Sequence, residues 1–203
     1  MSYLLSMSID LSPTKLAQAL IFALPFVLAG LIHIIVIKNN LLQSLADLPL
    51  DCGLKLRGQR VFGKNKTVRG ALTMIVGVTF CILIQATIVH YFPSTAKFAV
   101  INYNHISPLI WGLLLGIGCV VGELPNSFIK RQLKIAPGNQ TTGIFKPFFW
   151  VIDQVDSLIG VLIFAGILWK PTYDMLILLF LYTIIIHPIG ALIMVSLGLK
   201  RSI

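Results

Sequence analysis

Acidic side chains are scarce in this chain of 203 residues, which contains only seven Asp and Glu against sixteen Lys and Arg. Charged residues make up 11% of the sequence, whereas soluble domains usually carry about 25%. Hydrophobic residues make up 57%, and the mean hydropathy is +0.90. So little charge argues against an ordinary soluble domain and predicts an integral membrane protein.

Other absences exclude further classes of protein. The three cysteines, Cys52, Cys81 and Cys119, are odd in number and scattered, so they indicate neither a disulfide framework nor a metal cluster. The alternating pattern of membrane barrel strands is missing. Basic residues are not interleaved with aromatic ones as a nucleic-acid platform requires, so we expect no nucleic-acid partner.

Five apolar segments have the length, about 17–25 residues, that a membrane-spanning helix needs. We therefore predict an all-α polytopic membrane protein with five transmembrane helices and two functional cytoplasmic loops, 38–69 and 123–150. The whole chain, residues 1–203, forms a single transmembrane domain in this prediction. The first helix lacks the cleavage site of a signal peptide and is expected to be retained. The five helices are expected at about 16–37, 70–92, 106–122, 151–169 and 175–199.

Lys and Arg are distributed unevenly between the two sides of these helices. Thirteen of the sixteen lie in the first loop, in the third loop or at the C-terminal end, and only Lys15, Lys97 and Lys170 lie on the other side. By the positive-inside rule, the N-terminus lies outside and the C-terminus in the cytoplasm. We predict a multi-pass protein of the cell (inner) membrane.

Glycines and basic residues are concentrated between Gly58 and Gly70, directly before the second predicted helix. Glycines let backbone amides approach an anion, Lys and Arg add positive charge, and a helix N-terminus adds a partial positive charge. A polyphosphate site is favoured, the alternative being charges that only fix topology and contact anionic lipid headgroups. The nucleotide- and phosphate-binding candidates are Gly63, Lys64, Lys66, Thr67, Arg69 and Gly70, together with Asn126 of the third loop.

The remaining helices carry features that predict packing. Four glycines of the third predicted helix have the spacing of close helix contacts and permit a homodimer. His187-Pro188 indicates a kink in the last helix. The three tryptophans lie near the predicted interfaces and are interpreted as anchors. The glycines are Gly112, Gly116, Gly118 and Gly122, and the tryptophans are Trp111, Trp150 and Trp169.

Three of the seven acidic residues lie where two apolar segments meet the third loop. Glu123 is expected at the end of one helix, and Asp153 and Asp156 about one turn inside the next. A short helix is expected to begin at Ser127, with Lys130 and Arg131 beside it. Ionisable groups at this membrane depth are functional candidates.

Clustered carboxylates repel one another unless a cation holds them. A hard divalent ion, Mg²⁺ first of all, has the right preference for oxygen ligands and bridges to phosphate oxygens. The alternative is that the two aspartates form structural ion pairs with Arg131 or Lys146.

Two of these segments resemble the signature of the CDP-diglyceride synthetases: Ser127-Phe-Ile-Lys-Arg131 and Asp153-Gln-Val-Asp156. The loop Phe62-Gly-Lys-Asn-Lys-Thr-Val-Arg-Gly70 and the five helices resemble the smaller CDP-archaeol synthase family more closely, over most of residues 16–199. Glu123 stands where this family usually has aspartate, and Val68 where it usually has tryptophan. The His-Gly-Gly element of the larger synthetases is absent, as in the archaeol-type branch.

The resemblance implies a CTP-dependent nucleotidyltransferase of phospholipid biosynthesis. CTP and a membrane lipid phosphate, archaetidic-acid-type or phosphatidate-like, would give a CDP-activated lipid and pyrophosphate, with Mg²⁺ as cofactor. The implied metal ligands are Glu123, Asp153 and Asp156. The implied catalytic residues are Asp153, Asp156, Lys130, Arg131 and Ser127, and basic residues of both loops would neutralise the phosphates.

Two other activities compete with this interpretation. An ion or anion transporter would use the same carboxylates, but an odd number of helices does not divide into two inverted repeats. A CDP-alcohol phosphotransferase needs a longer run of aspartates joined to Gly and Ala-Arg, which this sequence lacks.

Overall fold

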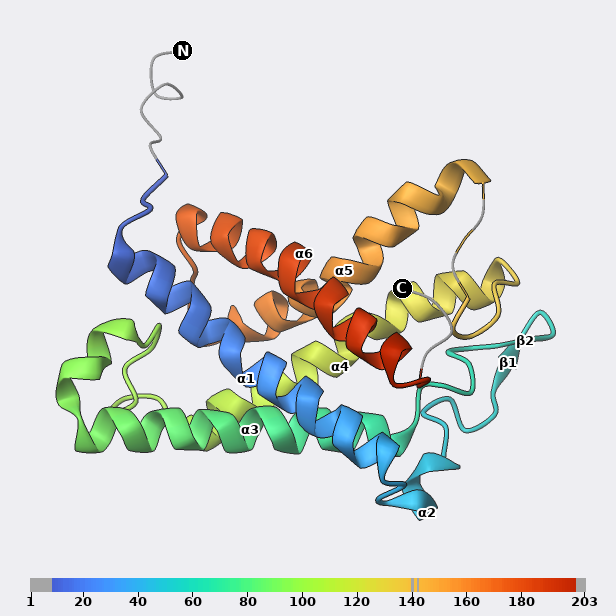
Figure 1. Ribbon diagram of the computed structural model, residues 1–203, viewed down its shortest axis with the longest axis horizontal. Coiled ribbons are helices and arrows are strands. Elements are labelled where there is room, and N and C mark those ends of the chain that lie inside the picture. The colour runs from blue at the N-terminus through green and yellow to red at the C-terminus, as the bar shows by residue number, and fades with distance from the viewer. Residues whose placement is uncertain (1–8, 140, 142, 200–203) are drawn as a thin grey trace, which may run out of the picture.

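The computed structural model describes residues 9–139, 141 and 143–199 (Figure 1). Within them, five helices are long and apolar enough to cross a membrane, which confirms the predicted all-α membrane fold. Each lies close to a predicted apolar segment. They are α1 (Pro13–Lys38), α3 (Val68–Tyr91), α4 (Pro108–Gln132), α5 (Lys146–Ala165) and α6 (Tyr173–Ser196).

Short elements connect these helices. Between α1 and α3 lie α2 (Gln43–Ala46) and an antiparallel hairpin of β1 (Lys55–Leu56) and β2 (Gln59–Arg60). The hairpin turns at Arg57 and Gly58, which both have positive φ (52° and 77°), as a tight primed turn requires. Two 3-10 helices, η1 (Pro93–Phe98) and η2 (Gly143–Phe145), precede α4 and α5.

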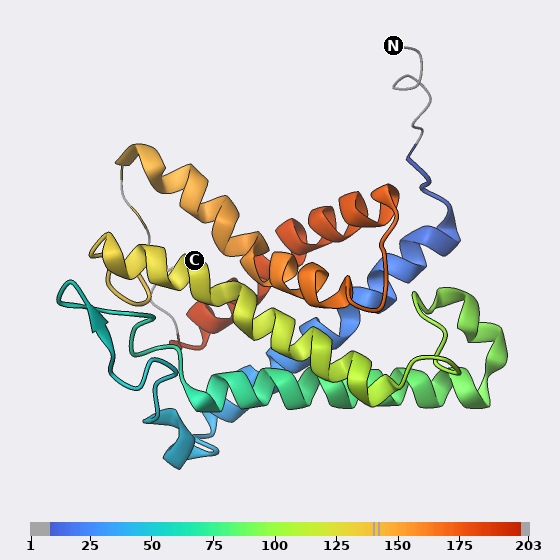
Figure 2. The ribbon, with the colours of Figure 1, turned by 180° about the vertical axis from the view of Figure 1, so that it is seen from behind.

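Helix α4 occupies the centre of the bundle, with α3 on one side and α5 on the other (Figures 1 and 2). Helix α1 packs on α3 and α6, and α6 also contacts α5. At the end of the bundle near the start of α1, Trp111 is buried against Phe22 and Trp169. The interpretation of Trp111 as an interfacial anchor is therefore wrong, because its ring belongs to the core.

The four glycines of α4 form two stripes that face different neighbours. A Cβ at Gly112 would lie 2.7 Å from the Thr79 Cα of α3, whereas a Cβ at Gly118 would lie 2.8 Å from the Gly160 carbonyl oxygen of α5. Gly116 belongs to the first stripe and Gly122 to the second. The predicted close packing is confirmed, and these contacts form within the chain.

Two helix boundaries differ most from the prediction. Helix α4 continues through Pro125 to Gln132, so Glu123 lies inside it and no separate helix begins at Ser127. A proline removes a single backbone donor, and the side chains beyond it still pack against α5. Helix α5 begins at Lys146 instead of residue 151, with Pro147 in its first turn, where the missing N–H costs nothing.

The contact of α4 with α5 predicts a steep steric penalty at Gly160. A Cβ there would lie 2.1 Å from the Gly118 carbonyl oxygen and 2.5 Å from the Gly122 Cα. We expect Gly160→Ala to lower the midpoint of thermal unfolding in detergent by roughly 2–12 °C, since overpacking costs about 1–3 kcal/mol.

Gly30→Ala in α1 is the matched control, because nothing lies within 4 Å of the position that a Cβ would take there. It is expected to leave the midpoint unchanged or raise it slightly, as alanine favours a helix over glycine. Equal midpoints for the two variants would contradict the tight contact.

Candidate active site

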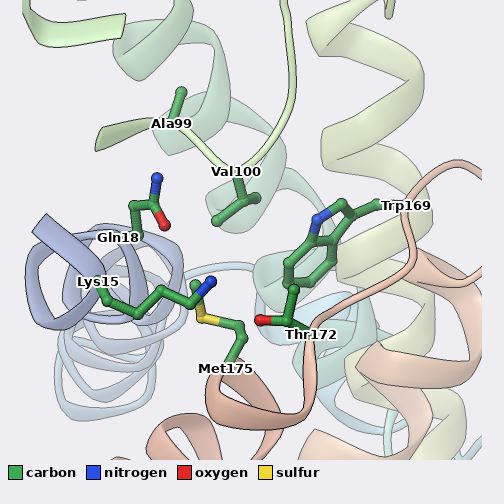
Figure 3. A pocket seen from close by; sticks show the side chains of 7 residues that line it. All are labelled: Lys15, Gln18, Ala99, Val100, Trp169, Thr172 and Met175. Atoms are coloured by element: carbon green, nitrogen blue, oxygen red, sulfur yellow. The ribbon is translucent and has the colours of Figure 1, made fainter. Parts of the chain in front are cut away.

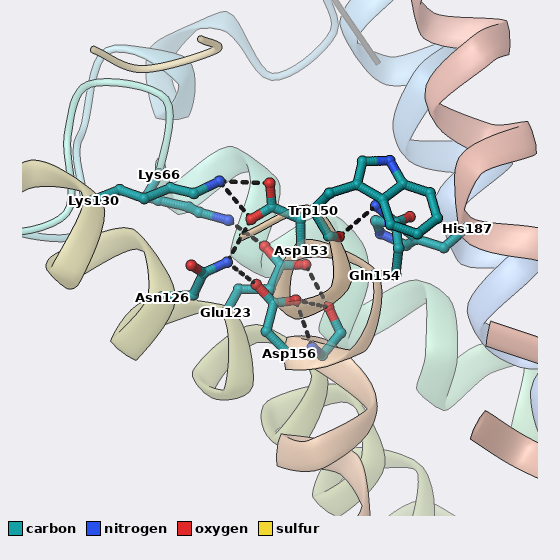
Figure 4. A network of polar contacts seen from close by, with 10 residues as sticks. Lys66, Glu123, Asn126, Lys130, Trp150, Asp153, Gln154, Asp156 and His187 are labelled. Carbon is teal, nitrogen blue, oxygen red and sulfur yellow. Dashed lines mark hydrogen bonds and ion pairs between the residues drawn. The ribbon is translucent and has the colours of Figure 1, made fainter. Parts of the chain in front are cut away.

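Polar side chains of α4 and α5 meet in one network (Figure 4). Asn126 and Lys130 are four residues apart on α4 and Asp153 and Asp156 three apart on α5, so each pair shares one helix face. The Asn126 Nδ2 donates to Asp153 Oδ1 and to Asp156 Oδ2, at 2.7 Å each. The Lys130 ammonium group donates to both oxygens of Asp153 at 2.5 Å. One amide therefore joins two carboxylates.

Glu123 is linked to the same network from one turn further back along α4. Ser157 Oγ donates to Glu123 Oε1 at 2.9 Å and to Asp156 Oδ1 at 3.3 Å. The Lys66 ammonium group, from the first loop, donates to Glu123 Oε2. The structure thus brings the three predicted carboxylates together, with a lysine from each of two separate segments.

Backbone pairing positions Lys66 at the start of α3. The amide of Leu50 donates to the Lys66 carbonyl, and the amide of Val68 donates to the Leu48 carbonyl, both at 2.8 Å. Thr67 is the N-cap residue of α3, and its hydroxyl accepts from the amide of Gly70. Burial alone would lower the pKa of Lys66, but the Glu123 carboxylate outweighs it and raises that pKa above its ordinary value.

The buried guanidinium of Arg131 lies behind the first loop. A Cβ at Gly63 would lie 3.2 Å from the Arg131 Cδ, so the loop packs on the stem of this side chain. Arg131 is 8% exposed, and its Nε and Nη1 have no hydrogen-bond partner among the described residues. Buried donors without an acceptor are costly, and an anion is the ligand that would satisfy them.

The ion pair that Asp153 makes differs from the predicted alternatives. Its partner is Lys130, and neither Arg131 nor Lys146 pairs with it in the described structure. Lys130 lies on the helix face that meets α5. Arg131 is the next residue, so it lies on a different face of α4, where its side chain approaches Gly63.

Other candidate residues lie outside the network. Lys64 is exposed, and Arg69 donates to the Leu41 carbonyl at 3.4 Å. Gly70 lies beside the His33 ring of α1. Ser127 is half-buried, but it is Ser157 that bonds the carboxylates. The roles predicted for these residues stay predictions.

Gly63 is a predicted phosphate-binding residue, and that role stays a prediction. Its φ is +97°, a conformation that L side chains rarely adopt, so glycine is required. Its amide already donates to Asp51 Oδ2 at 3.2 Å. This N–H is therefore engaged within the loop, and Gly63 serves the close approach to Arg131.

Sequence reasoning missed several residues of this region. Gln154 is buried, and its Oε1 accepts from His187 Nδ1 of α6 at 2.9 Å, while its Nε2 donates to the Trp150 carbonyl. The sequence pattern marks His187 only as the neighbour of a proline. The sequence did offer a signal for two of these residues. Gln154 is a polar residue between Asp153 and Asp156, and Ser157 directly follows Asp156.

Two cavities flank the bundle. One of about 480 Å³ lies beside the network and is lined by Asn139, Phe145 and Phe149 among others, with the Phe149 ring centroid 5.8 Å from Lys130 Nζ. The other, of about 200 Å³, lies near the start of α1 and has Lys15, Trp169 and Thr172 among its lining residues (Figure 3). The residues that line this second cavity include no carboxylate.

Comparisons with known proteins identify the family. A sequence model of the CarS-like CDP-archaeol synthases matches residues 16–203. This chain belongs to the CDP-archaeol synthase family. The CDP-archaeol synthase of Methanocaldococcus jannaschii is 32% identical over 75% of this chain and 81% of its own length. That of Pyrococcus furiosus is 36% identical over 68% and 73%, respectively.

A solved structure has the same fold. It belongs to an intramembrane enzyme of archaeal membrane lipid biosynthesis and matches with a TM-score of 0.58, covering 86% of this chain and 92% of the other. The two sequences are 18% identical, so the likeness concerns the fold. Membership of the CDP-archaeol synthase family favours the predicted nucleotidyltransferase over the transporter and the CDP-alcohol phosphotransferase.

Enzymes of this family generally need a divalent metal. Among the described residues, no three His, Cys, Asp or Glu side chains are arranged to hold an ion by themselves. Instead, the Asn126 amide nitrogen bridges Asp153 and Asp156, and ammonium groups pair with Asp153 and with Glu123. The donor set still fits a hard cation, because Asn126, whose Nδ2 bonds Asp153 and Asp156, also has an Oδ1 that is buried without a partner in the described chain.

The ion pair of Lys66 with Glu123 is expected to stabilise the junction of the first loop with α4. Lys66→Met or Glu123→Gln alone leaves a partly buried charge unpaired, so each is expected to cost about 1–2 kcal/mol of unfolding free energy. The double variant should lose less than the sum, as thermal unfolding of all four proteins in detergent would measure.

Lys64→Met is the control, since Lys64 is exposed and forms no ion pair among the described residues. It is expected to change the unfolding midpoint by less than about 1 °C. Strictly additive losses for Lys66 and Glu123 would show that the two charges are not coupled.

Proposed function

We propose that this protein is a membrane cytidylyltransferase that joins CTP to a lipid phosphate and releases pyrophosphate. One observation carries the proposal: in a CDP-archaeol synthase fold, Lys66 and Lys130 converge with three carboxylates around Asn126. Positive charge suits the triphosphate, and carboxylates suit a divalent cation. Both kinds of group in one network match the needs of nucleotidyl transfer.

In the structure, Lys66 and Lys130 are neutralised by Glu123 and Asp153, respectively. We infer that binding exchanges these partners: Lys66 and Lys130 turn from carboxylate to phosphate oxygens, which charge-assisted hydrogen bonds favour. Glu123, Asp153 and Asp156 would then hold Mg²⁺, with Asn126 Oδ1 as a neutral ligand. When bound, Mg²⁺ supplies neutralisation of charge on the phosphate oxygens.

The lipid phosphate is itself the nucleophile, so the protein need not generate one. Its oxygen forms a bond to the α-phosphorus of CTP, and the bond to the departing pyrophosphate breaks. The chain's part is to align the two groups and to balance the negative charge. Arg131 is suited to a phosphate because its buried Nε and Nη1 lack an acceptor in the described chain.

Exposed apolar side chains suggest where the lipid approaches. Ile144, Phe145 and Phe148 are 88%, 63% and 61% exposed where η2 meets α5. Phe145 also lines the 480 Å³ cavity, beside Phe149 and Lys130. This side of the site suits apolar chains, and a phosphate head arriving there would reach Lys130 first.

The proposed reaction predicts release of pyrophosphate from CTP and Mg²⁺ by the purified protein in detergent. Ether-linked isoprenoid and ester-linked acyl phosphates should be offered in competition, since either class of lipid is compatible with the site. Asp153→Asn and Asp156→Asn are each expected to lower kcat roughly 100-fold or more.

Asp47→Asn is the control, because Asp47 is an exposed acid of the first loop. It should keep the wild-type rate, and all three variants should insert in membranes normally. Wild-type protein that releases no pyrophosphate with either lipid class would reject the function, and full activity of either α5 variant would reject its assigned residue.

The proposed orientation, with the N-terminus outside and the first loop in the cytoplasm, is testable with native cysteines. Cys52 is exposed in that loop, whereas Cys81 and Cys119 are buried in helices. A membrane-impermeant thiol reagent is expected to label Cys52 only after intact cells are permeabilised. Cys52→Ala should abolish the signal, and labelling of wild-type protein in intact cells would reverse the orientation.

A further inference from the structure

Asp51 lies in the first loop and has no exposed side-chain surface. Its Oδ1 accepts from the amide of Gly53 at 3.0 Å and from Arg60 Nη2 at 2.5 Å. Its Oδ2 accepts from the amides of Phe62 and Gly63, at 3.1 and 3.2 Å. One carboxylate therefore satisfies four donors, three of them backbone groups.

These donors keep Asp51 ionised. Burial alone would raise the pKa of the carboxyl group, but Arg60 and the three amides outweigh it and lower that pKa to about 2. The stabilisation that Asp51 gives is present above the ordinary pKa of aspartate and is lost only as the pH falls toward about 2. At neutral pH the carboxylate is fully charged.

The segment that carries Asp51 contacts both ends of the candidate phosphate loop. Leu48 and Leu50 pair with the backbone at Val68 and Lys66, where α3 begins. Asp51 then binds the other end, at Phe62 and Gly63. The stretch from residue 60 to residue 67 is thus fixed at both ends by four consecutive residues, 48–51.

Asp51 also determines how this loop meets α4. By accepting from its amide, Asp51 holds Gly63 at φ +97°, where the glycine packs against the Arg131 stem and Pro137. At the other end, Lys66 reaches Glu123. A loop released from Asp51 would lose the alignment of Lys66 with Arg131, although Asp51 touches neither.

We propose that Asp51 is a positioning residue for the nucleotide, which presets residues 60–67 in the conformation that receives the phosphates of CTP. This inference rests on the proposed function and assigns part of its nucleotide affinity to a buried acid. Since Asp51 is covered, it acts through the loop and not by contact with substrate. A loop that is not preset must be ordered during binding, so the apparent affinity equals the intrinsic affinity multiplied by the fraction of molecules in which the loop is already ordered.

The decisive variant is Asp51→Asn, which keeps the side-chain shape but replaces one acceptor oxygen with an amide group and removes the charge facing Arg60. We expect the KM for CTP to rise about tenfold or more. The KM for the lipid phosphate and kcat should stay within about twofold, because the α4–α5 network is intact. Asp47→Asn, an exposed acid four residues earlier, should match wild type.

Arg60→Gln gives a milder variant that retains the three backbone hydrogen bonds of Asp51. Its KM for CTP should rise less than that of Asp51→Asn, by about two- to fivefold. If Asp51→Asn does not fold, this variant carries the test, and an unchanged KM for CTP would overturn the proposal. Equal effects of the two variants would overturn the role assigned to the backbone amides.

Hydrogen exchange of the ligand-free protein provides a readout that does not need activity. The amides of Phe62 and Gly63 should exchange at least about tenfold faster in Asp51→Asn than in wild type or Asp47→Asn, with α4 and α5 unchanged. Unchanged exchange would overturn the proposal, as would a loss of kcat with the KM for CTP within twofold of wild type.

The kinetic and hydrogen-exchange measurements test the positioning role of Asp51 separately from the proposed cytidylyltransferase activity. Wild-type protein that turns over no CTP rejects the function, whatever the exchange data show. Wild-type turnover together with an Asp51→Asn enzyme of normal KM for CTP rejects the positioning role alone.

Discussion

Mutual neutralisation of a few charges in an apolar protein is the constraint on which this structure depends. Three carboxylates lie between α4 and α5, where unpaired charges would be costly. Lys130 comes from the same helix as Glu123, but Lys66 comes from a distant loop. The ion pair of Lys66 therefore draws the first loop onto the helices. This one ion pair both neutralises Glu123 within the bundle and fixes the position of the first loop.

Helix contacts and charge pairs support each other. Gly118 and Gly122 bring the α5 backbone close, and this closeness lets the single side chain of Asn126 reach both aspartates. Ser157 then joins Asp156 to Glu123. In the first loop, Asp51 performs a similar task by gathering backbone amides. Four of the chain's seven acidic residues thus organise one region.

The sequence was sufficient for the features that follow from composition and spacing. Hydropathy located the five helices, and the period of the glycines predicted close packing. The end of α4 was not predictable, because polar residues beyond Pro125 resemble a loop until α5 is there to receive Asn126 and Lys130. Asp51 was missed for a related reason: its partners are mostly backbone amides, whose positions depend on the loop conformation. The charge of Arg69 and its place in the basic loop predicted a phosphate ligand, yet its guanidinium donates to the Leu41 carbonyl.

The bare contact between Gly160 and the stripe of Gly118 and Gly122 has a consequence for access. At this contact no side chain lies between α4 and α5 that could swing aside, so we expect the two helices to stay together there. The two helices are therefore expected to behave as one rigid unit. An opening movement is then expected from the first loop, which meets α4 through the long side chains of Lys66 and Arg131.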